Sequence, residues 1–346
     1  MPELMLYTVA DLRNWLVHNQ SIVGLSAAAI APTRAYAIIN NPYVKDTDSV
    51  VAVIYEGEEL AAYTSAIPEE IEGIRYWWFS GLWCNPAYRG RGYGLALIGS
   101  LAEEYGVEYC LDRWGTPDVV EIFTFLGHKT LYAPRFILGK KLTRHTWTGR
   151  ALYALYRAES WLRSLTVIRD RSAYSLSYVT HIDDKTYAFI AAHKCRDLFL
   201  HSQPMLNWER QCSVTLTCPL LESVASSCVF APSELHHSDM YMVQVYVDKL
   251  VGFYMMKHND DSLHVLFAYY DLEAKHKVFA SIRDHLERLG ASQCITENLD
   301  LAMYLKKHCG FRKIKKLQVS FSYPKTLTIP TDFTMQNGDG DNFTVV

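Results

Sequence analysis

The residues best suited to chemistry lie in a glycine-rich segment, residues 82–94, with the sequence LWCNPAYRGRGYG. It overlaps the end of an apolar stretch, residues 76–84, and precedes an amphipathic pattern that begins at Leu95 and predicts a helix. A strand that enters a glycine-rich turn before a helix leaves unpaired backbone N–H groups at the helix N-terminus, where the helix dipole adds partial positive charge. The segment therefore predicts a cradle for a phosphate or pyrophosphate group.

Three glycines and two arginines give this segment its expected chemistry. Gly90, Gly92 and Gly94 carry no Cβ, so the backbone can approach a bulky anion and adopt positive φ angles. Arg89 and Arg91 supply local positive charge to a chain whose net charge is -3. The alternative is a tight turn whose arginines lie on a solvated rim. A P-loop and a dinucleotide fingerprint fit poorly, because the segment has no G-K-[ST] ending and lacks the last glycine spacing.

In residue types and context, the segment resembles motif A of the GNAT acyltransferase superfamily, which is Arg/Gln-x-x-Gly-x-Gly/Ala after the fourth strand of that fold. Arg89, Gly92 and Gly94 match this motif, and the preceding residues 85–88 (NPAY) are similar to the turn that ends that strand. The resemblance covers about residues 1–143 and extends more weakly over the whole chain.

The resemblance implies an enzyme that uses acyl-CoA, with acetyl-CoA as the expected donor and an amine on a small molecule or a peptide as the acceptor. Backbone amides of the glycine-rich loop would hold the pyrophosphate, and the fourth strand would pair with the pantetheine amides. The implied loop residues are Arg89, Gly90, Arg91, Gly92, Tyr93 and Gly94, and the implied strand residues are Leu82, Trp83 and Cys84.

The sequence departs from the family pattern in two places. The family usually carries a Tyr four residues before the closing Gly of its last helix, where it protonates the departing CoA thiolate, and here those positions hold Phe123 and Lys306. The second half also lacks motif A, because its matching stretch, residues 270–275 (YDLEAK), contains no glycine. We therefore expect a degenerate second copy and a single CoA site in the first half.

Acyl transfer to an amine requires a neutral amine, a polarised thioester carbonyl and a protonated thiolate leaving group. A backbone N–H of the fourth strand can polarise the carbonyl. The candidate general bases are Asp112, at the end of the predicted fifth strand, and Glu121, on the following helix; the candidate acid is Tyr132. Each of the three is also compatible with a packing or surface role. The aromatic residues at 76–79 and 83 could wall an acceptor pocket, although a place in the core is favoured for them.

The two halves of the chain repeat the same order of features. A predicted hairpin at residues 50–63 has a counterpart at 241–254, and an apolar strand follows each of two predicted helices. Those helices end at glycines, and Gly290 lies 184 residues after Gly106. A later pair of glycines, at positions 127 and 310, is separated by 183 residues. The agreement of the two offsets predicts a tandem duplication.

The fold class predicted is α/β (α+β), with two GNAT-type domains, each a mixed, mostly antiparallel sheet flanked by helices. The expected boundaries are 1–143 for the domain with the motif, 144–167 for a linking helix packed on both domains, and 168–330 for the degenerate copy. Residues 331–346 are rich in Gly, Asp and Asn, and we expect them to be disordered. The segment 198–208 (LFLHSQPMLNW) is expected in a helix pair that covers the second sheet.

Composition excludes several classes of protein. Apolar residues make up 49% of the 346 residues and charged residues 21%, so most of the chain should fold. The net charge of -3 disfavours nucleic acids and anionic membranes as partners. The N-terminus lacks a secretion signal, and no run approaches the ~20 apolar residues of a membrane helix, which predicts a cytoplasmic protein. The eight cysteines form no C-x-x-C pair, so we expect free thiols and no bound metal.

The expected function is acyl-CoA-dependent N-acyltransfer, most directly N-acetyltransfer, with the second domain shaping the acceptor pocket across the interface. One alternative is a CoA-binding sensor or scaffold without turnover, which the missing tyrosine favours. Another is acyl transfer from a different donor, such as an aminoacyl-tRNA. The acidity of the chain and its intact glycine-rich loop weigh against that donor.

Overall fold

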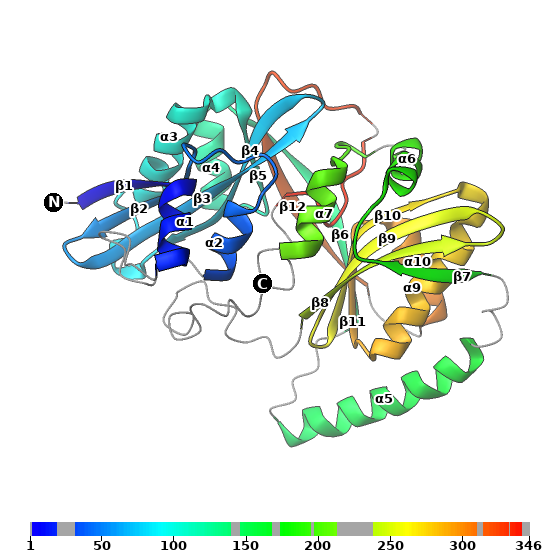
Figure 1. Cartoon of the computed structure of the whole chain (residues 1–346). Coiled ribbons are helices and arrows are strands. Elements are labelled where there is room, and N and C mark those ends of the chain that lie inside the picture. Colours follow the sequence, from blue (N-terminus) through cyan, green and yellow to red (C-terminus); the bar gives the residue numbers. More distant parts are fainter. Residues whose placement is uncertain are drawn as a thin grey trace.

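One twisted sheet of twelve strands runs through the structure, a computed structural model (Figure 1). The structure describes residues 2–18, 32–139, 146–167, 174–194, 197–212, 238–309, 314–331 and 333–340. The strand order across the sheet is β1-β2-β3-β4-β5-β12-β6-β11-β10-β9-β8-β7. The strands are β1 (Pro2–Thr8), β2 (Ser49–Glu56), β3 (Glu59–Ile71), β4 (Ile74–Cys84), β5 (Cys110–Arg113), β6 (Lys129–Gly139), β7 (Ser175–Val179), β8 (Ser238–Tyr246), β9 (Leu250–Asn259), β10 (Ser262–Tyr270), β11 (Gln293–Thr296) and β12 (Ile314–Tyr323).

The sheet consists of two equivalent sets of strands that exchange their last member. In the N-terminal half β1 to β5 are continued by β12, and in the C-terminal half β7 to β11 are continued by β6. β6 and β12 pair antiparallel along their length, with Lys129 opposite Tyr323 and Leu138 opposite Ile314. The mixed, mostly antiparallel sheets are as predicted. The exchange of β6 and β12 was not predicted. Because of this exchange, strands pair with one another across both expected domain boundaries.

The local elements of the repeat follow the sequence pattern. β2 and β3 form the first predicted hairpin and turn at Gly57, and β8 and β9 form the second. The two repeat helices end at Gly106 and Gly290, whose φ angles are +87° and +65°. Residues with a side chain rarely adopt such angles, which explains why both helices end at glycine.

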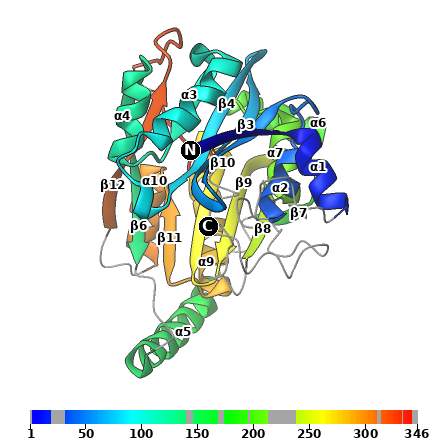
Figure 2. The ribbon, with the colours of Figure 1, turned by 90° about the vertical axis from the view of Figure 1, so that its left-hand side faces the viewer.

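Helices cover both faces of this sheet, as Figure 2 shows. α3 and α4 lie on one side of the N-terminal strands, and α1 and α2 on the other. The predicted helix pair over the second sheet is α6 and α7, which contact β9 and β8 respectively. The helices are α1 (Val9–His18), α2 (Pro32–Ile39), α3 (Tyr93–Tyr105), α4 (Pro117–Phe125), α5 (Trp147–Val167), α6 (Asp184–Ala192), α7 (Gln203–Cys212), α9 (Lys275–Leu289) and α10 (Leu299–His308), with short 3-10 turns η1 (Pro86–Tyr88), η2 (Val107–Tyr109) and η4 (Leu272–Ala274).

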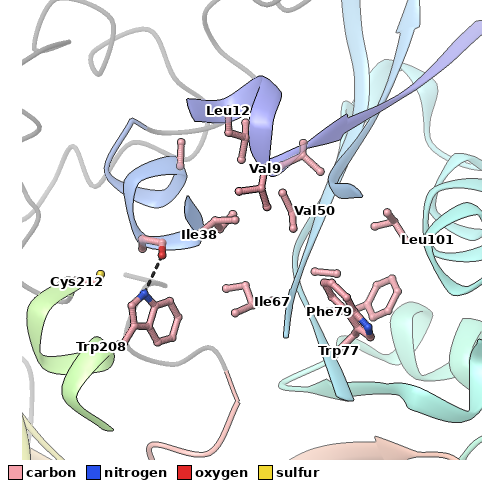
Figure 3. Close-up of a cluster of buried hydrophobic side chains, with 14 of the residues drawn as sticks. Val9, Leu12, Ile38, Val50, Ile67, Trp77, Phe79, Leu101, Trp208 and Cys212 are labelled. Carbon is pink, nitrogen blue, oxygen red and sulfur yellow. Dashed lines mark hydrogen bonds between the residues drawn. The ribbon is translucent and has the colours of Figure 1, made fainter. Parts of the chain in front are cut away.

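The apolar core is continuous between the two halves (Figure 3). Trp208 on α7 packs against α2, and its Nε1 donates a hydrogen bond of 2.8 Å to the carbonyl oxygen of Ala37. The same cluster reaches Trp77 and Phe79 on β4 and Leu101 on α3. The helix that was expected only to cover the second sheet therefore also joins the two halves.

The connecting helix α5 forms where the sequence predicts one, but its packing differs from the expectation. It contacts α9, and Figure 1 shows it beneath the C-terminal half, apart from the N-terminal strands. Its large apolar side chains point outward, with Trp147, Leu155 and Trp161 all more than half exposed. The predicted packing on both domains is therefore wrong. Among the described helices, none is long and apolar enough to span a membrane.

The tail after residue 331 is also ordered where the structure describes it, which corrects the expectation of disorder for 333–340. Met335 and Asp339 are buried. The amide of Gly338 donates to the carbonyl of Leu266 on β10 at 3.0 Å, and the side chain of Gln336 accepts from the Ala268 amide at 2.8 Å. Polar groups of the kind that suggested disorder instead form hydrogen bonds with partners in β10.

A substitution in the tail tests this packing. A Cβ placed on Gly338 would lie 2.3 Å from the nearest ring carbon of Phe267, a fully buried side chain that cannot move aside. Gly338→Ala should therefore lower the free energy of unfolding by about 1–3 kcal/mol, measured by urea denaturation. The control is Gly99→Ala, because a Cβ there meets nothing within 4 Å and sits inside α3. A Gly338→Ala protein as stable as Gly99→Ala would show that the tail does not pack as described.

Candidate active site

The glycine-rich loop has the backbone geometry that the sequence predicts for an anion cradle. Gly90 and Gly92 both have a φ angle of +80°, and Gly92 is the N-cap residue of α3. The first N–H groups of a helix have no acceptor within the helix, so those at the start of α3 are directed toward the loop. Gly94 also allows close packing, because a Cβ there would lie 3.3 Å from Ile122 on α4.

The two arginines of the loop differ in their surroundings. Arg91 forms an ion pair of 3.1 Å with Glu56, at the end of β2, and its guanidinium lies over the ring of Tyr88. Arg89 donates from Nε to the carbonyl oxygen of Cys84 at 3.3 Å and is exposed. Arg89 is therefore the cation more readily available to a bound anion.

The strand before the loop diverges from its neighbour. β4 and β5 pair only where Trp77–Phe79 lie beside Cys110–Asp112. After that point β4 continues through a bulge at Gly81, which has a φ angle of +68°, to Cys84. A bulge bends the strand and redirects the side chains that follow it. The implied pantetheine residues Leu82, Trp83 and Cys84 lie on this diverging part of β4.

A cavity of about 520 Å³, here called the first cavity, lies where the two strands separate. Both halves of the chain contribute residues to its wall. Its charged and polar lining includes Asp112, Arg113, Thr116, Arg135, Lys257, Asn259, Ser262, His264 and Gln293.

Asp112 is the most distinctive group in the first cavity. It is 5% exposed, and its Oδ2 has no hydrogen-bond partner. Among the described residues it forms no ion pair. Burial raises the pKa of this carboxyl to about 7, because the charged form loses its hydration. A carboxyl that titrates near neutrality can accept a proton at physiological pH.

Trp114 follows Asp112 by two residues and also lines the first cavity. It adopts a φ angle of +72°, which is rare for a large side chain and marks local strain. The guanidinium carbon of Arg135 lies 4.0 Å from the centre of its ring, and that of Arg113 lies 4.9 Å away. The strained tryptophan thus holds two arginines of different strands against one ring.

The structure does not bring the other two predicted catalytic residues to this cavity. Glu121 is exposed on α4 and does not line it. Tyr132, on β6, is 60% exposed and lines a different cavity. Phe123 does line the first cavity and is fully buried, and the described lining contains no tyrosine. The role that the family gives to a tyrosine is therefore not filled by one here.

Arg135, Lys257 and His264 are lining residues that the sequence did not reveal. Arg135 lies on β6, which the exchange places two strands from β5, and the other two lie on the C-terminal half. No local motif surrounds them, and only the long-range strand pairing brings them to the first cavity.

The corresponding place in the C-terminal half is closed by the tail. Leu266 and Ala268, which bind the tail, lie 184 residues after Leu82 and Cys84, the offset of the repeat. The loop is also absent there, because η4 leads directly into α9. A second cavity, of about 670 Å³, remains beside the tail, but without a glycine cradle. The described part of the C-terminal half therefore lacks the loop geometry seen at the start of α3.

A buried ionic network joins the tail to the floor of the site. His201 lies between Glu69 and Asp339, with 2.8 Å from Nε2 to Asp339 Oδ1. Arg113 pairs with Glu297 and donates to the backbone carbonyl of Asp339 at 2.7 Å. Burial opposes a charge on His201, but the two carboxylates outweigh it and raise the pKa of His201 well above its usual value. Burial also raises the pKa of Glu297, to about 7.

The strand order, the diverging β4 and β5 and the glycine loop at the start of α3 together define a tandem acyltransferase-type fold. Comparison with known proteins agrees. The sequence model of the acetyltransferase (GNAT) family matches residues 10–120. Residues 10–120 of the chain therefore match a GNAT-family domain. No curated protein sequence matches the chain.

Solved structures show the same fold at low sequence identity. A candidate acetyltransferase from Pyrococcus horikoshii aligns over 97% of this chain and 93% of its own, with 9% identity and a TM-score of 0.51. The N-myristoyltransferase of Saccharomyces cerevisiae with bound myristoyl-CoA aligns over 100% of this chain and 85% of its own, with 13% identity and a TM-score of 0.50. A tandem GNAT protein from the clavulanic acid biosynthesis pathway aligns over 95% and 100%, with 12% identity and a TM-score of 0.48.

The loop geometry makes one substitution informative. Gly92→Val should abolish detectable acetyl-CoA binding in calorimetric titration, a loss of at least about tenfold in affinity. Valine is strained at a φ angle of +80°, and its side chain would project into the open space where the pyrophosphate is expected. The matched control is Gly57→Val, at a φ angle of +63° in a hairpin turn outside the cradle. Unchanged affinity in Gly92→Val, or equal losses in both variants, would refute the cradle.

Proposed function

We propose that this protein is an N-acyltransferase that binds acyl-CoA, most directly acetyl-CoA, in its N-terminal half and transfers the acyl group to an amine. One observation carries the proposal: a buried carboxyl without a cationic partner, Asp112, faces the first cavity beside the diverging β4, the strand that leads into the glycine-rich loop. A carboxyl that is buried without a partner destabilises the folded protein, and such groups are typical of catalytic sites. The proposed residues of the site are Arg89 to Gly94 for the pyrophosphate, Leu82 to Cys84 for pantetheine and Asp112 as the base.

A single carboxyl can carry out the proton transfers of the proposed reaction. The neutral amine attacks the thioester carbon, a C–N bond forms and the C–S bond breaks. The amine proton passes to the carboxylate of Asp112, and the departing thiolate takes up one proton, so that the net transfer is from nitrogen to sulfur. A backbone N–H of the diverging part of β4 polarises the carbonyl. Protonated Asp112 can return the proton, which is consistent with a cavity whose described lining holds no tyrosine.

A CoA-binding sensor without turnover is the second candidate, and Phe123 favours it. This residue stands where the family carries its acid, and its ring is fully buried against Phe79. The two candidates share the CoA site and differ in whether an amine is acylated.

Titration followed by turnover tests the proposal. Acetyl-CoA, desulfo-CoA and a longer acyl-CoA would be titrated calorimetrically into the full chain, and thiol release would then be followed with a panel of amines. Binding and amine-dependent thiol release would support acyltransfer, and the preferred acyl-CoA would set the chain length. Binding without release for any amine would favour the sensor. Failure to bind any acyl-CoA would refute both.

A further inference from the structure

One cation of the first cavity, Arg135, forms no direct ion pair with a described residue, although the charges of Glu297 and Arg113 act on it. Among the described residues Arg135 forms no hydrogen bond or ion pair, and its Nε is buried without an acceptor. Its guanidinium is held instead by the ring of Trp114. Arg113, which also lies over that ring, pairs with Glu297 through Nη2 and donates from Nη1 to two backbone carbonyls of the tail. Burial lowers the pKa of Arg135 to about 10, so its charge is retained at neutral pH at a cost in free energy.

A half-buried guanidinium that donates no hydrogen bond has lost part of its hydration without compensation. The loss is recovered when an anion enters the cavity and accepts its hydrogen bonds. A carboxylate fits this role best, since it matches one guanidinium in a planar, two-bond geometry. A phosphate dianion would bring a second charge that the engaged Arg113 cannot balance, close to the buried Glu297.

The sheet register sets the distance between this cation and the proposed base. Asp112 lies opposite Ser322 on β12, and Arg135 lies opposite Leu317 on the same strand. The two positions are therefore separated by five residues, or about 16 Å, along β12. An α-amino acid, whose amine and carboxylate share one carbon, is too short to reach both groups.

We propose that the acceptor is an amine that also carries a carboxylate several bonds away, as in an ω-amino acid or a short peptide, and that Arg135 binds this carboxylate while Asp112 receives the amine proton. This inference rests on the proposed function, since it names the acceptor of the same site. Arg135 is then a specificity-determining residue supplied by the exchanged strand β6.

Paired acceptors test the assignment in the full chain. Thiol release from acetyl-CoA would be measured with glycine, 6-aminohexanoate and triglycine, and with 6-aminohexanamide and triglycinamide, in which the carboxylate is replaced by an amide. Each carboxylate should be preferred over its amide by at least about tenfold in kcat/KM, with glycine the poorest of the acids. Arg135→Gln should remove this preference by weakening use of the carboxylates alone. Arg13→Gln, in an exposed ion pair on α1, should leave it intact.

Two further measurements separate the possible failures. Acetyl-CoA affinity should be unchanged in Arg135→Gln, and 6-aminohexanoate should bind wild type calorimetrically at least about tenfold more tightly than 6-aminohexanamide. If wild type does not bind acetyl-CoA, the proposed function fails, while the second titration still tests the anion site. Equal use or equal binding of acid and amide would overturn the inference. So would a preference for glycine, or for phosphoethanolamine over 6-aminohexanoate.

Discussion

Asp112→Asn is expected to reduce turnover by about 10²- to 10⁴-fold while leaving acetyl-CoA binding intact. Asparagine has the shape of aspartate but cannot accept the amine proton. Thiol release in the presence of an amine and calorimetric titration of acetyl-CoA would give the two quantities. The control is Glu121→Gln, because Glu121 is an exposed carboxylate on α4 that does not line the cavity. If both variants keep full turnover, Asp112 is not the base.

The pH profile of the same variant separates catalysis from structure. A base must be deprotonated to act, and the pKa of Asp112 is raised to about 7. Wild-type kcat should therefore rise with pH up to about 7 and then level off. Asp112→Asn should lose this rise, which a purely structural effect would not produce.

Asp112→Asn is expected to raise the free energy of unfolding although it lowers turnover. A carboxyl with a raised pKa in the folded state destabilises that state progressively between its unfolded pKa, about 4, and its folded pKa, about 7. Above pH 7 the cost is constant, and it amounts to about 4 kcal/mol at most. Asp112→Asn should thus be more stable than wild type by about 2–4 kcal/mol at pH 8 and equal to it near pH 4, measured by urea denaturation. Lower stability at pH 8 would contradict the buried, unpaired carboxyl.

The parts of the site that the sequence predicts are those encoded locally. Gly90 and Gly92 are glycines because the chain needs φ angles of +80° there, and a strand and a helix flank them in the sequence itself. Asp112 could be chosen because it lies near the end of the short strand that follows the helix after the glycine-rich loop. Glu121 and Tyr132 satisfied the same rule of proximity in sequence, but the helix turns the first outward and the strand exchange carries the second to the other cavity.

The strand exchange could not be predicted for a physical reason. β6 and β12 are equivalent strands of the repeat, so each has the apolar pattern that suits either half of the sheet. A sequence pattern fixes which side chains face the core, but it does not fix which of two equivalent partners a strand joins. Arg135 and the second-half residues reach the first cavity only through that choice of partner. The sequence therefore did not reveal the side of the site for which we propose acceptor binding, whereas it did reveal the glycine-rich loop.

The order of the tail could not be predicted from its composition either. Gly, Asp and Asn usually mark solvated chain, because burying them costs free energy unless they find partners. Asp339 interacts with His201, which lies 138 residues earlier in the sequence, and with Arg113, which lies 226 residues earlier. The composition of the tail indicates how much free energy its burial costs. It does not indicate which distant residues offset that cost.

Asp339→Ala is expected to lower the free energy of unfolding by about 3–5 kcal/mol at pH 7. The substitution leaves His201 with one carboxylate and removes an acceptor of the Gln336 amide, while Arg113 keeps Glu297. The control is Asp46→Ala, whose exposed pair with Arg13 should contribute less than about 1 kcal/mol. A loss no larger than that of the control would show that this ion pair does not hold the tail.

The pH dependence identifies His201 as the origin of the effect. A histidine whose pKa is raised by folding stabilises the protein fully below its unfolded pKa, about 6.5, and the stabilisation is lost as pH rises toward the folded pKa. Over this range wild type should lose about 1.4 kcal/mol per pH unit from this group. Asp339→Ala should lose less, because Glu69 alone raises the pKa of His201 by a smaller amount. Asp112 and Glu297, with pKa values of about 7, are largely ionised by pH 8 in both proteins, so the difference between the two slopes above pH 8 isolates His201.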